Sequence, residues 1–73
     1  MSKRFPRLTA SEVEKVLSRH GFELVGQSGS HRKWWHSGTH RTVIVPLHQG
    51  RALPIGTLRQ IVTASGILPS EWR

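Results

Sequence analysis

The sequence predicts an α+β domain of element order α-β-β-β-α, in which two helices cover one face of a three-stranded antiparallel sheet. Three observations predict this fold: a capped amphipathic segment near the start, three strand-like runs separated by turn residues, and a second apolar stripe between Pro54 and Gly66. At 73 residues, the chain is long enough for one domain and too short for two. We expect the core of this domain over about 9–68 and a short tail over 69–73.

A first helix is predicted from Thr9 to Gly21. Thr9 is followed three residues later by Glu12, the spacing of a capping box, in which each side chain accepts a hydrogen bond from the other residue's backbone N–H. Three apolar residues recur at helical spacing and form the face to be buried: Val13, Val16 and Leu17. Gly21 suits the left-handed backbone position that follows the last turn, so we expect the helix to end there.

An antiparallel meander follows the first helix. Its three strands are predicted over 22–27, 31–36 and 41–45. Ser28, Gly29 and Ser30 form the first turn, and a polar loop over 37–40 forms the second. Pro46 lacks a backbone N–H and stops the third strand.

A second helix is predicted to open at Pro54, in the first turn of a helix, where a missing backbone N–H is harmless. Its apolar stripe is formed by Leu58, Ile61 and Val62. Gly66 ends it, and Ile67 and Leu68 are expected to pack under the sheet. Because two helices cover only one face of a three-stranded sheet, the other face stays open.

The charge distribution indicates an anionic partner. Eleven Lys and Arg against four Asp and Glu give a formal net charge of +7, and no acidic residue lies between Leu24 and Ser70. The sheet and its loops therefore carry a positive field, which favours a polyanion or an acidic protein as ligand.

The composition also excludes several classes of protein. The chain has no cysteine, which excludes disulfides, thiolate metal sites and cysteine nucleophiles. The start of the chain, 1–7, is basic but is not followed by an apolar run, and no stretch approaches the ~20 apolar residues of a membrane span. We therefore expect a soluble, cytoplasmic protein without a membrane partner.

The second strand divides its side chains between the two faces of the sheet. The two sets are His31, Lys33 and Trp35 on one face and Arg32, Trp34 and His36 on the other. Since two adjacent tryptophans cannot both be core residues, we assign Trp34 to the helix-covered face. On the open face the ring of Trp35 can stack on a base while Lys33 binds a phosphate. Trp35 covering the sheet edge or lying in a protein interface is an equally good interpretation.

His31 is the most interesting titratable residue. It follows a Gly-Ser turn among cationic residues and far from any acid, and this setting favours the neutral imidazole that can act as a base. A solvated surface histidine is the plain alternative. A zinc site built from four histidines, namely His31, His36, His40 and His48, is disfavoured because the first two face opposite ways and no carboxylate lies nearby.

Other catalytic motifs are not supported. Ser30 lies next to His31 but has no acid to orient the base of a serine triad, and no glycine-rich loop of the P-loop or dinucleotide type is present. We expect neither metal nor cofactor.

Four short motifs together resemble the HicA toxin family. They are Gly21-Phe22 after the first helix, Gly29-Ser30-His31 leading to Trp34, Val45-Pro46 followed by His48, and Gly56-Thr57-Leu58 in the last helix. They occur in family order from about Thr9 to Ile67, whereas the paired Trp34-Trp35 departs from the family pattern.

The resemblance implies a fold like the double-stranded-RNA-binding domain and a toxin of a type II toxin–antitoxin pair. Such a toxin cleaves mRNA without a metal and is held inactive by a HicB antitoxin, here expected to be acidic. The resemblance makes His31 the active histidine, and the other four histidines match no catalytic position.

RNA cleavage requires few protein groups, because the 2′-OH attacks the adjacent phosphate once a base removes its proton. We expect His31 to act on the 2′-OH and a cation, Lys33, Arg32 or Arg41, to neutralise the phosphate. Ser30 and Trp35 complete the predicted RNA-binding set. The alternative is a non-catalytic RNA-binding module that uses the same open basic face.

Overall fold

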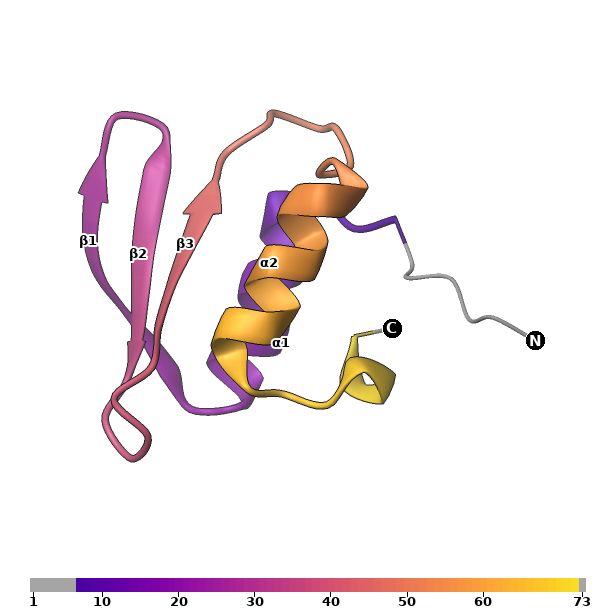
Figure 1. Cartoon of the computed structure of the whole chain (residues 1–73). Helices are drawn as coiled ribbons and strands as arrows, with labels where there is room; N and C mark the ends of the chain where they lie inside the picture. The colour runs from indigo at the N-terminus through magenta and orange to yellow at the C-terminus, as the bar shows by residue number, and fades with distance from the viewer. Residues whose placement is uncertain (1–6, 73) are drawn as a thin grey trace.

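The computed structural model describes residues 7–72, and its element order is the predicted α-β-β-β-α. The elements are α1 (Ala10–Arg19), β1 (Phe22–Ser28), β2 (His31–His36), β3 (Thr42–Pro46), α2 (Ile55–Ser65) and a short 3₁₀ helix, η1 (Pro69–Glu71). Figure 1 shows both α-helices on one side of the sheet, as predicted. The expectation that the chain starts without a targeting signal falls almost wholly on 1–6, outside the described residues.

The capping box predicted for α1 is present. The Glu12 N–H donates to the Thr9 hydroxyl at 3.2 Å, and the Thr9 N–H donates to the Glu12 carboxylate at 2.9 Å. The backbone hydrogen bond from Thr9, with the Thr9 hydroxyl second, holds the pKa of Glu12 below its usual range. Three apolar residues of the helix are buried as predicted, namely Val13, Val16 and Leu17.

The sheet has the strand order β1-β2-β3, with antiparallel pairing throughout. Gly29, with φ +56°, occupies the first position of the two-residue turn between β1 and β2, where a positive φ matches the twist of the strands. A β-bulge, which the alternation of apolar and polar residues does not predict, interrupts β1 between Leu24 and Gly26. Pro46 is the last residue of β3, which lies at an edge of the sheet, where a proline is tolerated.

The core lies between the helices and the covered face of the sheet. The predicted stripe of α2, Leu58, Ile61 and Val62, is buried there. Gly66 ends α2 with φ +72°, as predicted. This positive φ favours glycine, and a Cβ here would also lie 2.6 Å from Arg41 Nε, so the arginine side chain would have to move.

Two predictions for the end of the chain are wrong. The segment expected to be a tail forms η1 over Pro69–Glu71 and then places Trp72 in the core with 0% exposure. Leu68, expected under the sheet, is 68% exposed, whereas its neighbour Ile67 does pack against the core. The η1 turn leads the chain from the exposed Leu68 to Trp72, whose large apolar ring is fully buried.

Replacement of Trp72 by alanine should lower the free energy of unfolding by roughly 3–5 kcal/mol, because the fully buried ring is replaced by a cavity. The matched change Leu68→Ala should alter it by less than about 0.5 kcal/mol, since that side chain is exposed. Urea unfolding followed by circular dichroism measures both. Equal shifts in the two midpoints would show that Trp72 is not part of the core.

Candidate functional site

The open face of the sheet, the face that α1 and α2 leave uncovered, carries every second residue of β2. Trp34 is 9% exposed on the covered face and Trp35 is half-buried on the open face, which confirms the assignment of the two tryptophans. The strand register sets nine residues of the open face side by side: Glu23, Gly26 and Ser28 from β1, His31, Lys33 and Trp35 from β2, and Thr42, Ile44 and Pro46 from β3.

Glu14 on α1 explains why Trp34, and not Trp35, is the core residue. The indole N–H of Trp34 donates to Glu14 Oε2 at 2.9 Å, so the ring is buried without leaving its polar atom unpaired. The pairing joins residues 20 positions apart in the chain, which is why strand alternation alone did not identify this partner.

His31 is the first residue of β2, directly after the turn, and its Cα partners are Ser28 and Pro46 on the two neighbouring strands. The turn before His31 is also held by the segment that follows β3, because the Leu47 N–H donates to the carbonyl of Ser30 at 2.7 Å. The imidazole of His31 is exposed and has no hydrogen bond or ion pair with any residue of 7–72. A firmly held backbone therefore presents an imidazole that is available to a ligand.

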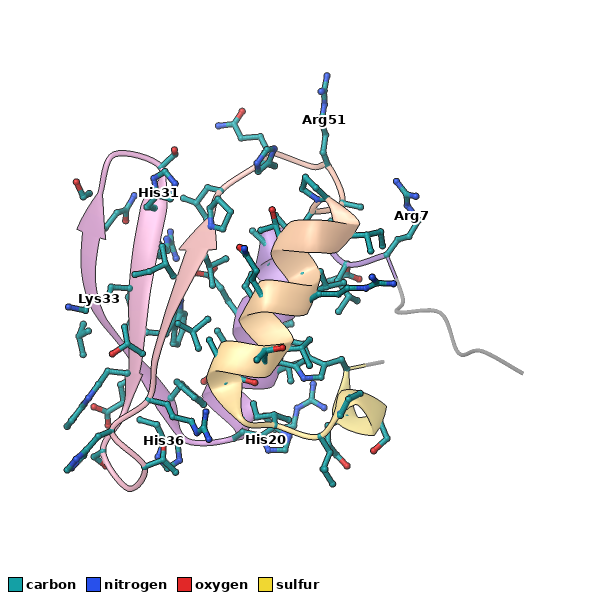
Figure 2. The ribbon with its side chains drawn as sticks, viewed as in Figure 1. Arg7, His20, His31, Lys33, His36 and Arg51 are labelled. Carbon is teal, nitrogen blue, oxygen red and sulfur yellow. The ribbon has the colours of Figure 1, made fainter. Side chains whose placement is uncertain are left out.

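Lys33 lies in the middle of the open face. Its Cα partners are Gly26 and Ile44, and a Cβ built at Gly26 would meet nothing within 4 Å. The missing side chain leaves space beside the lysine on the β1 side. Figure 2 shows His31 at one end of β2 and Lys33 at its middle, with the lysine extending away from the helices.

Trp35 has a partner that the sequence did not predict. The ring of His40 stacks on the indole, with centroids 5.9 Å apart and planes within 9°. His40 comes from the loop between β2 and β3, and no local sequence signal indicates that its ring reaches back over the strand. Glu23 and Thr42 are the Cα neighbours of Trp35 on the outer strands.

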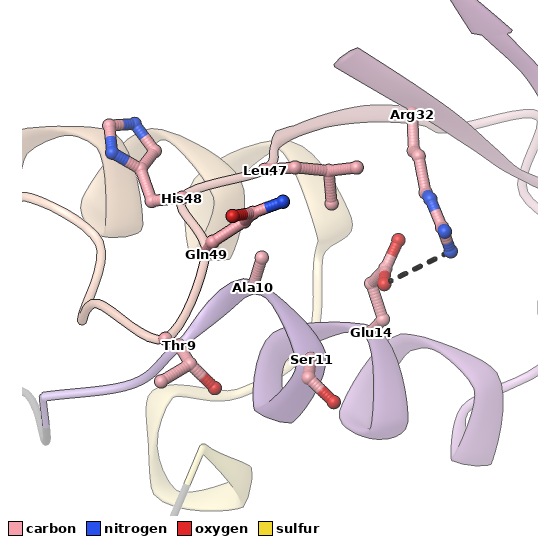
Figure 3. Close-up of a pocket in the computed structure, with 9 residues that line it drawn as sticks. Thr9, Ala10, Ser11, Glu14, Arg32, Leu47, His48 and Gln49 are labelled. Carbon is pink, nitrogen blue, oxygen red and sulfur yellow. Dashed lines mark hydrogen bonds and ion pairs between the residues drawn. The ribbon is translucent and has the colours of Figure 1, made fainter. Parts of the chain in front are cut away.

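Arg32 lies on the covered face and not beside His31. Its Nη1 is 3.4 Å from Glu14 Oε1, and Figure 3 shows the side chain extending from β2 toward α1. The pair borders a hollow of about 390 Å³ that is also lined by His48, whose ring points away from the pair in Figure 3. Because Arg32 is engaged by a carboxylate, its position does not support the predicted contact with a phosphate at His31.

Arg41 also points to the helix side. Its Nη1 donates to the carbonyl of Ala64 at 3.3 Å, one of the last carbonyls of α2, where a cation is favourable. Of the five residues predicted to bind RNA, the structure thus groups Ser30, Lys33 and Trp35 with His31 and places Arg32 and Arg41 elsewhere.

The remaining histidines are dispersed. His36 accepts hydrogen bonds at Nδ1 from the N–H groups of Gly38 and Thr39, each at 3.1 Å, and so shapes the second loop. Within residues 7–72, no three His, Cys, Asp or Glu side chains are gathered closely enough to hold a metal ion. No helix in the same range is long and apolar enough to cross a membrane.

Replacement of Glu14 by alanine should destabilise the fold by about 1–3 kcal/mol, because the buried N–H of Trp34 and the guanidinium of Arg32 lose their acceptor. In a domain of this size, each kcal/mol lowers the melting temperature by about 4–8 °C. The matched variant Glu23→Ala, on the open face, should melt within a few degrees of the parent protein. Equal melting temperatures for the two variants would contradict the role of Glu14.

Comparison with known proteins agrees with the resemblance found in the sequence. A family model described as "HicA toxin of bacterial toxin-antitoxin" matches residues 10–67, from the first residue of α1 to just beyond α2. No curated protein matches the chain. HicA toxins are ribonucleases of toxin–antitoxin systems, so a match to the family implies an RNA target and a HicB antitoxin as partner. With most of its 73 residues matched, the chain belongs to the HicA toxin family.

Proposed function

We propose that this HicA toxin is a metal-independent endoribonuclease, an mRNA interferase, in which His31 is the general base. Membership of the family supports ribonuclease activity, and the motif Gly29-Ser30-His31 resembles the segment that holds the family's active histidine. The observation that carries the proposal is that His31 and Lys33 share the open face while the imidazole has no partner within residues 7–72.

The chemistry needs one base and one cation. His31 takes the proton of a ribose 2′-OH, and the 2′-oxygen then attacks the adjacent phosphorus. The bond from phosphorus to the 5′-oxygen breaks, and the 5′-oxygen receives a proton from the imidazolium. The products are a 2′,3′-cyclic phosphate and a 5′-hydroxyl.

Lys33 is the cation best placed to offset the charge that develops on the phosphorane. Two residues along a strand span roughly 6.6 Å, so a phosphate bound between the two side chains is within reach of both. Ser30 lies in the turn next to His31 and offers a hydroxyl as an additional hydrogen-bond donor. Arg32 and Arg41 contribute to the field of the surface and not to this contact.

An acidic HicB antitoxin should inhibit by covering His31. The formal charge of +7, with Glu23 as the single acid of the described sheet, gives the open face a field that attracts an anionic protein and RNA alike. The two ligands then compete for one surface.

Replacement of His31 by alanine should lower the rate of RNA cleavage by about 10²- to 10⁴-fold, the usual contribution of a general base. The fold should be unchanged because the side chain is exposed and unpaired within the described range. Gel analysis of a labelled RNA measures the rate, and circular dichroism checks the fold. The control His48→Ala removes an exposed histidine from outside the open face and should cleave at the parent rate.

Undiminished cleavage by a folded His31→Ala variant would overturn the assignment. The same experiment separates the enzyme from a non-catalytic RNA-binding module, which would show no cleavage before or after the change.

Cleavage should persist in excess EDTA, because the described residues provide no cluster of metal-binding side chains and the proposed steps use none. A cleavage assay with and without chelator measures this, with end analysis of the products. Loss of activity that zinc or magnesium restores, or products ending in a 5′-phosphate, would contradict the mechanism.

A further inference from the structure

The Trp35–His40 pair is an aromatic surface that the proposed chemistry does not use. The two rings are nearly parallel, and a centroid separation of 5.9 Å at 9° corresponds to offset stacking. Offset stacking leaves part of each ring face uncovered. Trp35 is only half-buried and His40 is exposed, so the stack ends at solvent.

The backbone at His40 is a second, independent observation. Its φ of +61° is the one positive φ of a non-glycine residue within 7–72. The conformation is fixed by the loop, since the His40 N–H donates to the carbonyl of His36 at 2.7 Å. Glycine would adopt this φ without strain, so the histidine is held here at a conformational cost and its ring lies on Trp35.

The charges on the open face separate it into two parts. Lys33 gives a positive charge to the end of the face that holds His31, and this end suits phosphates. Trp35, about 13 Å further along β2 from His31, has Glu23 as its Cα neighbour, and a carboxylate beside the rings disfavours a phosphate. An uncharged, planar group fits the aromatic end better than a phosphate does.

We propose that Trp35 and His40 form a stacking subsite for one unpaired nucleobase of the RNA whose scissile phosphate lies at His31. This proposal rests on the proposed function, because it takes RNA as the ligand of the open face. A base in a duplex has both faces covered by its neighbours, whereas an unpaired base can extend the stack of Trp35 and His40. The subsite therefore selects single-stranded over duplex RNA.

Intrinsic fluorescence tests the subsite directly, because the chain has three tryptophans and the structure buries the other two, Trp34 and Trp72. In the His31→Ala background, which should not consume the ligand, a short single-stranded oligouridylate should quench the emission of Trp35. The same strand annealed to its complement, and inorganic polyphosphate, should bind by charge without this quenching.

Three variants in the same background locate the contact. Trp35→Ala should weaken binding of the single strand by roughly 5- to 150-fold, the effect of losing one stacked base. Trp35→Phe should restore part of it. His40→Gly removes the ring and relieves the positive φ, so it should weaken binding while thermal stability stays equal or rises.

Salt dependence distinguishes stacking from charge. The measurement is the slope of log affinity for the single strand against log salt concentration. Lys33→Ala should make this slope shallower by roughly 0.7 for each phosphate that the lysine neutralises. Trp35→Ala should leave the slope unchanged.

Equal affinity of the Trp35→Ala variant and its parent for the single strand would overturn the subsite, and so would equal quenching by polyphosphate. Quenching by the antitoxin together with no effect of single-stranded RNA would identify Trp35 as a protein interface instead. These results do not depend on the catalytic role of His31, which the cleavage assay decides separately.

Discussion

The hydrogen bond from the Trp34 indole to Glu14 is the interaction on which the arrangement of the open face depends. The side chains of β2 alternate with a period of two, so the choice of which tryptophan is buried decides the face of every other residue in the strand. With Trp34 held against α1 at 2.9 Å, His31 and Lys33 must lie on the opposite face. A slip by one residue would bury them and expose Arg32. One contact between a helix and the central strand thus determines which groups meet a ligand.

Some of the basic residues of this chain hold the fold together and do not face a ligand. Glu14 binds Trp34 with one oxygen and Arg32 with the other, and Arg41 binds the C-terminal end of α2. These two arginines hold helices to the sheet. The cation left on the open face of the strand is Lys33, beside an imidazole with no partner in the described range. The proposed site is therefore small, with one imidazole and one nearby cation, and we expect a modest rate of RNA cleavage.

The fold was predictable because its signals are local: a capping box, strand alternation, turn glycines and a helical stripe each concern neighbouring residues. The alternation of side chains along β2 also predicted that His31 and Trp35 lie on the open face of the sheet. Contacts between distant residues were not predictable, and most of the misses belong to this class, whereas the β-bulge in β1 is a local feature that was also missed. The return of Trp72 to the core depends on the path of η1, and the direction of Arg41 depends on where α2 ends. The ring of His40 stacks on Trp35 from a loop position with a positive φ, which no local pattern indicates.

The strand β3 provides an internal comparison for testing whether RNA binds the face of the sheet opposite the helices. Ile44 lies on the open face and is 46% exposed, whereas its neighbours Val43 and Val45, at 1% and 0%, face the core. Methyl NMR spectra of the His31→Ala variant, recorded while single-stranded RNA is added, report on both faces at once. We expect the Ile44 methyl signals to shift with RNA and those of both valines to stay in place. Shifts confined to methyl groups of α1 and α2, with Ile44 unchanged, would contradict it.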